Sequence, residues 1–258
     1  MRAIIATGIL TGYCLASAIG GAATPGVELS VLVTTRAVAD ETVPEIVRRA
    51  LDNLLPAGTA RVWYVTDGFS VRAAHSEGMF GIPPGAIRLA RREDKSLYVV
   101  NPEQKTYYIA RTDPWGKGTE APVVSIDKST LSKQLLGHKA TKVTLNYSQR
   151  VQLRGGQGGQ GLQEVKVSVE NWCTAEVRVP ASLPAMMDVA GRIAGLANMD
   201  YAAACPLALE SAVRLSVLQG VEVLTTVEQI KRVPDLGAGI FDIPAGFQDV
   251  TKHEGSTN

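Results

Sequence analysis

The chain has 258 residues, of which 45% are hydrophobic, and its formal net charge at pH 7 is +1. This length allows one sizeable core or two small ones, and the balanced charge gives no basic surface of the kind that binds nucleic acid or an anionic membrane. Arg88, Arg91 and Arg92 form the densest basic run, but Glu93 and Asp94 follow at once, so we interpret this run as a solvated, charged loop.

The N-terminal stretch has the parts of a secretory signal peptide. Arg2 gives a positive start, an apolar run reaches Leu10, and small residues follow, with candidate cleavage sites after Ala18 and after Ala23. We predict a signal peptide over residues 1–23, cleaved after Ala23, with cleavage after Ala18 as the alternative. A retained anchor is the competing interpretation, because the run approaches the roughly 20 residues that a helix needs to span a bilayer. Cleavage predicts a periplasmic or secreted protein with no transmembrane segment.

The cysteines bear on the compartment as well. Cys14 lies in the leader and follows Tyr13, whereas a lipid-modified cysteine normally follows a small residue, so we do not expect a lipoprotein. Loss of the leader leaves Cys173 and Cys205, and an even pair in an oxidising compartment predicts a disulfide. Closing a loop of about 33 residues would stabilise the fold by roughly 3–4 kcal/mol. A metal site is disfavoured, because neither cysteine has a second Cys or His at the short spacing of zinc sites.

Most of the mature chain alternates between apolar and polar residues with the period of a strand. Turn signals separate these segments: Asp67-Gly68 and Gln219-Gly220 suit tight hairpins, and Asn101–Gln104 suits a four-residue turn. Strands are expected within residues 27–38, 60–74, 86–89, 97–100, 106–110, 141–153, 163–170, 176–179 and 213–233. After the last of them we expect a connector that buries Phe241 and Ile243.

Other segments have helical or loop patterns. Residues 42–55 open with a capping box and carry apolar residues at helical spacing, which predicts a helix. Residues 183–197 place their apolar side chains on one helical face and predict an amphipathic helix between the two cysteines. Residues 113–127 predict a loop, and residues 129–136 predict a short helix that ends at Gly137.

Many strands at hairpin spacing, with one or two helices, predict a mainly β fold (β with α). We expect a curved antiparallel sheet with the helices on its concave face, because a sheet must cover its apolar face. No internal repeat or linker divides the chain, so we predict a single domain over residues 24–250, followed by a polar tail over residues 251–258.

No motif in the chain signals catalysis. Residues 156–161 match the spacing GxGxxG, but a strand pattern follows at residues 163–170 where a dinucleotide site requires a helix, so we interpret the match as a hairpin tip. His75 and His138 are in turn-like contexts, His253 is in the tail, and none has metal-ligand spacing. We therefore predict a protein that is not an enzyme and has no catalytic residue, no cofactor and no metal site.

The helix between the cysteines carries the candidate site. Its apolar face is suited to an adaptable wall for a hydrophobic ligand, and the same residues would serve equally as ordinary core. Tethered over the open side of a curved sheet, the helix could be a lid or a plug. The candidate lid residues are Leu183, Met186, Met187, Ala190 and Ile193.

The order of several segments resembles a known superfamily. Residues 97–107 read LYVVNPEQKTY, residues 137–143 read GHKATKV, Trp172 lies within 169–177, and the chain closes with FDIPAGF at residues 241–247. The chain resembles an uncharacterised family of secreted bacterial proteins related to the lipoprotein carriers typified by LolA, LppX and the sensor domain of RseB. The resemblance implies an incomplete, LolA-like half-barrel whose concavity receives acyl chains or hydrophobic segments.

Two functions follow as hypotheses. The first is a protein that binds a lipid or an acylated peptide in the half-barrel cavity, gated by the helix 183–197. The second is a structural or sensor-type module whose helices fill the cavity and whose sheet meets a protein partner. The chain departs from the carriers in its insert at residues 42–55 and in the segment between the cysteines, and either could block the cavity.

Overall fold

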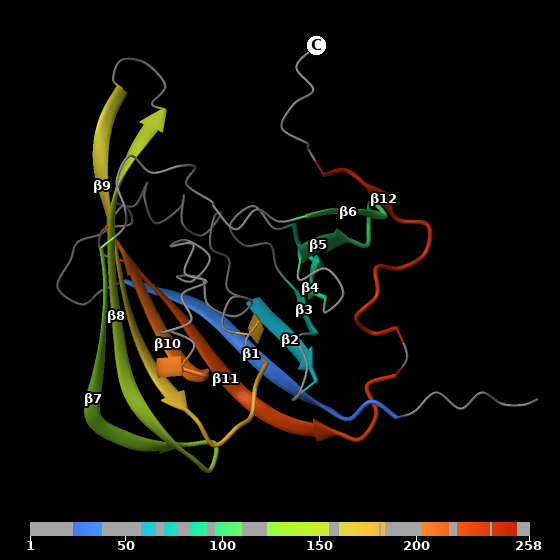
Figure 1. Ribbon diagram of the computed structural model, residues 1–258, viewed down its shortest axis with the longest axis horizontal. Coiled ribbons are helices and arrows are strands. Elements are labelled where there is room, and N and C mark those ends of the chain that lie inside the picture. Colours follow the sequence, from blue (N-terminus) through green and yellow to red (C-terminus); the bar gives the residue numbers. More distant parts are fainter. Residues whose placement is uncertain are drawn as a thin grey trace, which may run out of the picture.

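The fold is a single open sheet of twelve strands (Figure 1). The computed structural model describes residues 23–37, 58–65, 70–76, 83–91, 96–109, 123–154, 160–180, 182–183, 203–216, 221–237 and 239–251. The sheet has the order β12-β6-β5-β4-β3-β2-β1-β11-β10-β9-β8-β7, and every neighbouring pair is antiparallel except β12 with β6. The protein is therefore mainly β, as the alternating sequence predicts.

The strands follow the chain almost in hairpin order. Their bounds are β1 Gly26–Ala37, β2 Gly58–Tyr64, β3 Val71–His75, β4 Ile87–Ala90, β5 Leu97–Asn101, β6 Thr106–Ile109, β7 Val123–Leu135, β8 His138–Arg154, β9 Gln160–Thr174, β10 Leu207–Leu215, β11 Val221–Val233 and β12 Gln248–Asp249. There are two exceptions: β12 pairs with β6, and β1 lies between β2 and β11, so that the first and the eleventh strands meet in the middle of the sheet.

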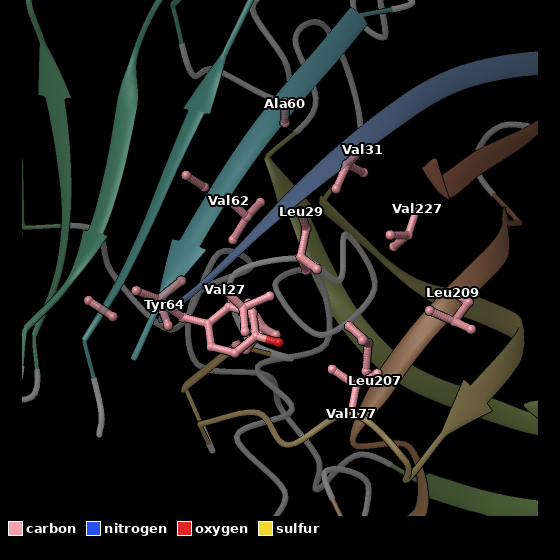
Figure 2. Packing of buried hydrophobic residues seen from close by; sticks show 14 of the residues in the cluster. Val27, Leu29, Val31, Ala60, Val62, Tyr64, Val177, Leu207, Leu209 and Val227 are labelled. Carbon is pink, nitrogen blue, oxygen red and sulfur yellow. The ribbon is translucent and has the colours of Figure 1, made fainter. Parts of the chain in front are cut away.

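The main apolar cluster lies on one face of β1 to β4 and continues onto β10 and β11 (Figure 2). Directly opposite residues of an antiparallel pair point to the same face, and Leu29 of β1 lies opposite Val62 of β2. The cluster consists of Val27, Leu29, Val31, Ala60, Val62, Tyr64, Val71, Ala73, Ala90, Ala140, Val177, Leu183, Leu207, Leu209 and Val227. We call this set the interior cluster.

A second cluster covers the other face of β4 and β5. Leu89 belongs to it while the next residue, Ala90, belongs to the interior cluster, and successive strand residues point to opposite faces. The chain after β11 supplies the cover, because the half-buried Ile243 and Phe247 pack on this second cluster. Arg72 fastens the same stretch by donating to the carbonyl of Ile240 at 3.1 Å. The expected connector is thus present in part: Ile243 packs on the sheet but is half-buried, and Phe241, also half-buried, is not a member of the cluster.

One edge of the sheet is covered by a short strand, and the other edge is formed by a strand with no buried residue. The two residues of β12 run parallel to β6 and cover its edge, with hydrogen bonds from Gln248 N to Lys105 O (2.9 Å) and from Val250 N to Tyr107 O (2.8 Å). At the opposite edge, β7 has no buried residue along its thirteen. Its ladder with β8 is interrupted by a bulge between Lys128 and Ser132, a device that discourages edge-to-edge pairing.

Several sequence-based expectations are wrong. The short helix expected at residues 129–136 is the second half of β7, and Gly137 is the tip of a two-residue hairpin in which Leu135 pairs with His138. The end of the loop expected at residues 113–127 is the start of β7. Residues 176–179 do not pair as a strand, because the chain has left the sheet after Thr174.

The charged loop expected at residues 88–94 also needs correction at its start. Arg88 is part of β4 and is buried, where its Nε donates to Nε2 of His75 at 2.9 Å. His75 ends β3 and is buried too, rather than exposed in a turn.

Other expectations lie outside the described residues. These are the signal peptide over residues 1–23, save for Ala23 itself, the helix at 42–55 and most of the helix at 183–197. Of the last, Leu183 is described, and it is in helical conformation together with the preceding Ser182. The turns at Asp67-Gly68 and Gln219-Gly220 are outside as well, although the strands on either side of each pair as hairpins, β2 with β3 and β10 with β11. Helices on the concave face therefore remain a prediction.

Candidate functional site

The candidate site is where the chain leaves the sheet and returns to it. Residues 175–206 connect β9 to β10, and these two strands are neighbours, with Leu207 opposite Thr174. A hairpin of a few residues would suffice for this connection, whereas 32 residues separate the ends of the two strands. We call residues 175–206 the β9–β10 connection.

A disulfide closes the base of the β9–β10 connection. Cys173 and Cys205 are joined, with their Cα atoms 5.1 Å apart and a sequence separation of 32. Both side chains are buried. The predicted disulfide is confirmed, and it holds the first and last residues of the connection at one point of the sheet.

The described start of the connection packs on the interior cluster. Val177 and Leu183 both belong to that cluster, and Leu183 is only 1% exposed. The backbone N–H of Leu183 donates to the carbonyl of Pro180 at 3.0 Å, which turns the chain over the apolar face. Of the five candidate lid residues, Leu183 is therefore a core residue, while Met186, Met187, Ala190 and Ile193 lie outside the described residues.

Polar contacts tie the same stretch to β8. A carboxylate oxygen of Glu176 accepts from the backbone N–H of Lys139 at 3.3 Å and lies 3.3 Å from Nδ1 of His138. The backbone N–H of Glu176 donates to the hydroxyl of Thr174 at 3.2 Å. The first residues after β9 are thus positioned by the β7–β8 hairpin as well as by the disulfide.

Tyr64 brings a polar group into the interior cluster. Its ring extends from the end of β2 into the cluster, with the hydroxyl at the inner end (Figure 2). The side chain is 0% exposed, and no hydrogen-bond partner reaches its hydroxyl among the residues that the structure describes. Burial raises the pKa of Tyr64 well above its usual range, so the phenol is neutral and can donate a hydrogen bond.

Sequence reasoning missed this tyrosine, although a signal for it exists. Ala60, Val62 and Tyr64 alternate along β2 and point the same way, so the period of two places the ring inside. The buried pair of Arg88 and His75 was missed as well. Arg88 lies opposite Ala73, a residue of the interior cluster, so it faces the interior side of the sheet. As acceptor at Nε2, His75 is neutral with its proton on Nδ1.

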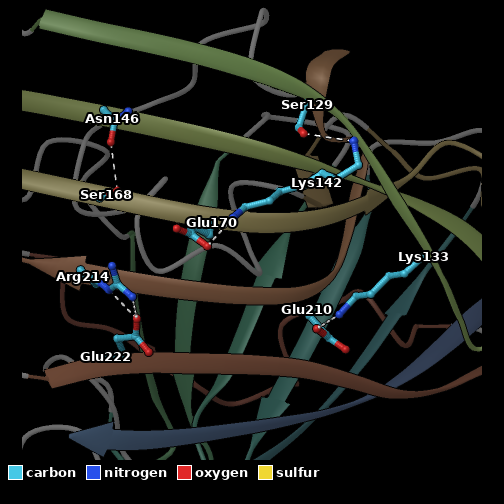
Figure 3. Close-up of polar contacts among 10 residues, drawn as sticks. Ser129, Lys133, Lys142, Asn146, Ser168, Glu170, Glu210, Arg214 and Glu222 are labelled. Carbon is cyan, nitrogen blue, oxygen red and sulfur yellow. Dashed lines mark hydrogen bonds and ion pairs between the residues drawn. The ribbon is translucent and has the colours of Figure 1, made fainter. Parts of the chain in front are cut away.

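The long strands also carry a face of ion pairs (Figure 3). Lys133 pairs with Glu210, and its ammonium lies 4.4 Å from the ring centroid of Trp172. Lys142 pairs with Glu170 at 2.8 Å. Most of these groups are at least a quarter exposed, and exposed pairs of this kind contribute little to stability. We interpret these two pairs as solvated, whereas Glu222, which pairs with Arg214 on the neighbouring strands, is buried.

The described residues bear on two further features, a metal cluster and a membrane-spanning helix. Among them no group of three His, Cys, Asp or Glu side chains is placed to hold a metal ion. Within the same residues no helix is long and apolar enough to cross a bilayer. The glycine-rich stretch near residue 158 joins β8 to β9, and Leu153 lies opposite Gly161, so a strand follows it and the dinucleotide pattern is not met.

Comparison with known proteins gives one structural similarity. No protein-family model matches the chain, and no curated protein matches it. The crystal structure of a LolA superfamily protein from Nitrosomonas europaea is similar over 84% of this chain and 90% of that one, with 9% sequence identity and a TM-score of 0.33. By its description, that protein belongs to the superfamily that this sequence resembles. A TM-score of this size carries no positional correspondence, so no residue role passes from that protein to this one.

Proposed function

We propose that this protein is a non-enzymatic, exported binding protein that holds a hydrophobic ligand, a lipid or an acylated peptide, against the interior face of its sheet. The observation that carries the proposal is the β9–β10 connection: it is long for a link between neighbouring strands, a disulfide closes its base, and Val177 and Leu183 in its described part pack on the interior cluster. The buried disulfide is compatible with an oxidising compartment, where such bonds persist.

Binding would proceed by exchange of apolar contacts. The ligand would replace Val177 and Leu183 on the interior cluster while the disulfide keeps the base of the connection in place. Burying one Val or Leu side chain stabilises by about 1.5–3 kcal/mol, so lifting both costs about 3–6 kcal/mol. Each buried methylene returns about 0.8 kcal/mol. A ligand therefore needs roughly four to eight buried methylenes before it binds at all, which favours long acyl chains over short ones.

The first test is native mass spectrometry of the protein purified from the cell envelope of its own host, followed by solvent extraction. A co-purifying lipid or acylated peptide is the expected result. Uptake of a neutral fluorescent probe, N-phenylnaphthylamine, and its displacement by methyl esters of increasing chain length give an independent measurement. A clean mass together with no probe uptake would overturn the proposal.

A second function is favoured by one observation. Leu183 and Val177 are integral to the interior cluster, as expected if the chain fills its own concavity. In that case the protein is a structural or sensor-type module that meets a protein partner through its sheet, and the ligand is absent.

Two substitutions separate the functions. Met187→Gln is expected to leave the unfolding free energy nearly unchanged if the helix is a lid, and to lower it strongly if the helix is a plug. Leu183→Gln is the matched control, because Leu183 is buried in either case and its replacement must destabilise the protein. Equal destabilisation by both variants, without probe uptake, would favour the self-filled module.

A further inference from the structure

The hydroxyl of Tyr64 is the one buried polar atom of the interior cluster that calls for a ligand. It lies at the end of a 0% exposed side chain and has no hydrogen-bond partner among the described parts of the chain. The other members of its cluster are Val, Leu and Ala side chains, which offer neither donors nor acceptors. A buried polar group left in this way is unfavourable, and a native protein that retains one usually has a reason.

The position of the hydroxyl matches the candidate site. Val177 of the β9–β10 connection and Leu207 at its exit belong to the same cluster as Tyr64. Val177 is one of the two side chains that the ligand of the proposed function would replace, and Leu207 of β10 would then line the space that it leaves. A group that enters there would meet hydrocarbon on its flanks and one phenol donor at the inner end of the ring (Figure 2).

The chemistry of the partner follows from the donor and its surroundings. A neutral phenol in an apolar environment donates to a carbonyl oxygen without requiring a charge nearby. A carboxylate is a poorer partner, because burying an ionised group costs far more than burying a carbonyl. An ester or amide carbonyl at the head of an aliphatic chain supplies both the acceptor and the apolar surface.

We propose that Tyr64 is a specificity-determining residue that donates a hydrogen bond to the acyl carbonyl of an ester- or amide-linked aliphatic chain held on the interior cluster. The inference rests on the proposed function, since it needs a ligand on the interior cluster. The Tyr64 hydroxyl selects among hydrophobic ligands: those with a neutral carbonyl at the head of the chain bind, and plain hydrocarbons of equal length bind more weakly.

The test compares matched ligands in wild type and Tyr64→Phe, a change that keeps the ring and removes only the hydroxyl. Methyl laurate and tetradecane have the same number of chain atoms, and each is titrated by displacement of N-phenylnaphthylamine. Wild type is expected to bind the ester about tenfold more tightly than the alkane, the factor that one net hydrogen bond supplies. In Tyr64→Phe the ester should lose its advantage and bind more weakly than the alkane, because its buried carbonyl then has no donor, while the affinity for the alkane stays unchanged or rises.

Tyr98→Phe is the control, because Tyr98 is also buried but belongs to the cluster on the opposite face of the sheet. It should keep the wild-type preference for the ester. The carbonyl stretching frequency of the bound ester adds a readout that a structural role would not move: it should be lower in wild type than in Tyr64→Phe.

The outcomes separate the two levels of the proposal. If wild type binds neither ligand, the proposed function fails and this inference with it. If both ligands bind but Tyr64→Phe keeps the preference for the ester, the binding function stands and the role of Tyr64 is overturned. Ionised laurate distinguishes free fatty acids from esters as the source of the carbonyl: it should bind more weakly than the ester, and tighter binding would overturn the neutral acceptor.

Discussion

The disulfide at the base of the β9–β10 connection gives the most quantitative prediction. Replacing Cys173 and Cys205 by alanine, or reducing the bond, releases a loop of about 33 residues in the unfolded chain. In the chain-entropy model such a loop contributes about 3.7 kcal/mol at 25 °C. For a domain of this size each kcal/mol corresponds to roughly 2–4 °C in melting temperature, so we expect a loss of about 10 °C.

Thermal unfolding followed by circular dichroism, with and without reductant, measures this change. Wild type without reductant should have the highest melting temperature and the Cys173→Ala, Cys205→Ala double variant the lowest. Reduced wild type should melt near the double variant. The double variant retains only Cys14, which cannot form a disulfide within the chain, so its melting temperature should be insensitive to reductant. A loss below about 1 kcal/mol would refute the assignment of the bond as the anchor of the connection.

Four further predictions concern stability. Tyr64→Phe should raise the unfolding free energy of the ligand-free protein by about 1 kcal/mol in urea titrations, since it removes a buried hydroxyl that has no partner among the described residues. Gly26→Ala should lower it by about 1–3 kcal/mol, because the new Cβ would lie 2.6 Å from the backbone carbonyl oxygen of Tyr64 and 2.2 Å from a methyl of Leu236. Leu136→Asn should raise the melting temperature, since Leu136 is exposed and has φ of 51°, a conformation that costs a leucine about 1 kcal/mol or more and that asparagine tolerates. Asp235 accepts hydrogen bonds from the backbone N–H groups of Gly237 and Thr24, and these bonds lower the pKa of its carboxyl. The contribution of this carboxylate to stability is therefore present above about pH 4 and is lost as the pH falls through the lower pKa of the folded state. Asp235→Asn should flatten this part of the curve of stability against pH, and an unchanged curve at acid pH would contradict the prediction.

The strands were predictable because their pattern is local. In strands such as β2 and β3 one face is buried, so apolar side chains recur every second residue, and the turns carry Gly, Asn or Asp where the backbone needs it. The register of β1 was not predictable. It pairs with β2, the next strand along the chain, and with β11, which begins only at Val221, so one of its two partners comes from the far end of the sequence.

The error at residues 129–136 shows how one signal serves two structures. Gly137 has φ of 80°, and a positive φ is required both after a helix and at the second position of a tight hairpin. The bulge between Lys128 and Ser132 also interrupts the alternation that would have favoured a strand. A glycine after a run of helix formers therefore does not distinguish a helix end from a hairpin turn. The pairing of residues 132–135 with β8 makes this segment a strand.

Tyr64 marks the limit of what periodicity can say about the candidate site. Its place on the inner face follows from the alternation of β2, but whether its hydroxyl is satisfied depends on groups brought in by β10 and by residues 177–183, more than a hundred positions away. Those segments bring hydrocarbon to it. The same atom thus lowers the stability of the empty protein and raises its selectivity for a carbonyl-bearing ligand, so stability and binding should respond to Tyr64→Phe in opposite directions. A variant that gains stability and loses ester preference would connect the two, whereas a gain in one without a loss in the other would separate them.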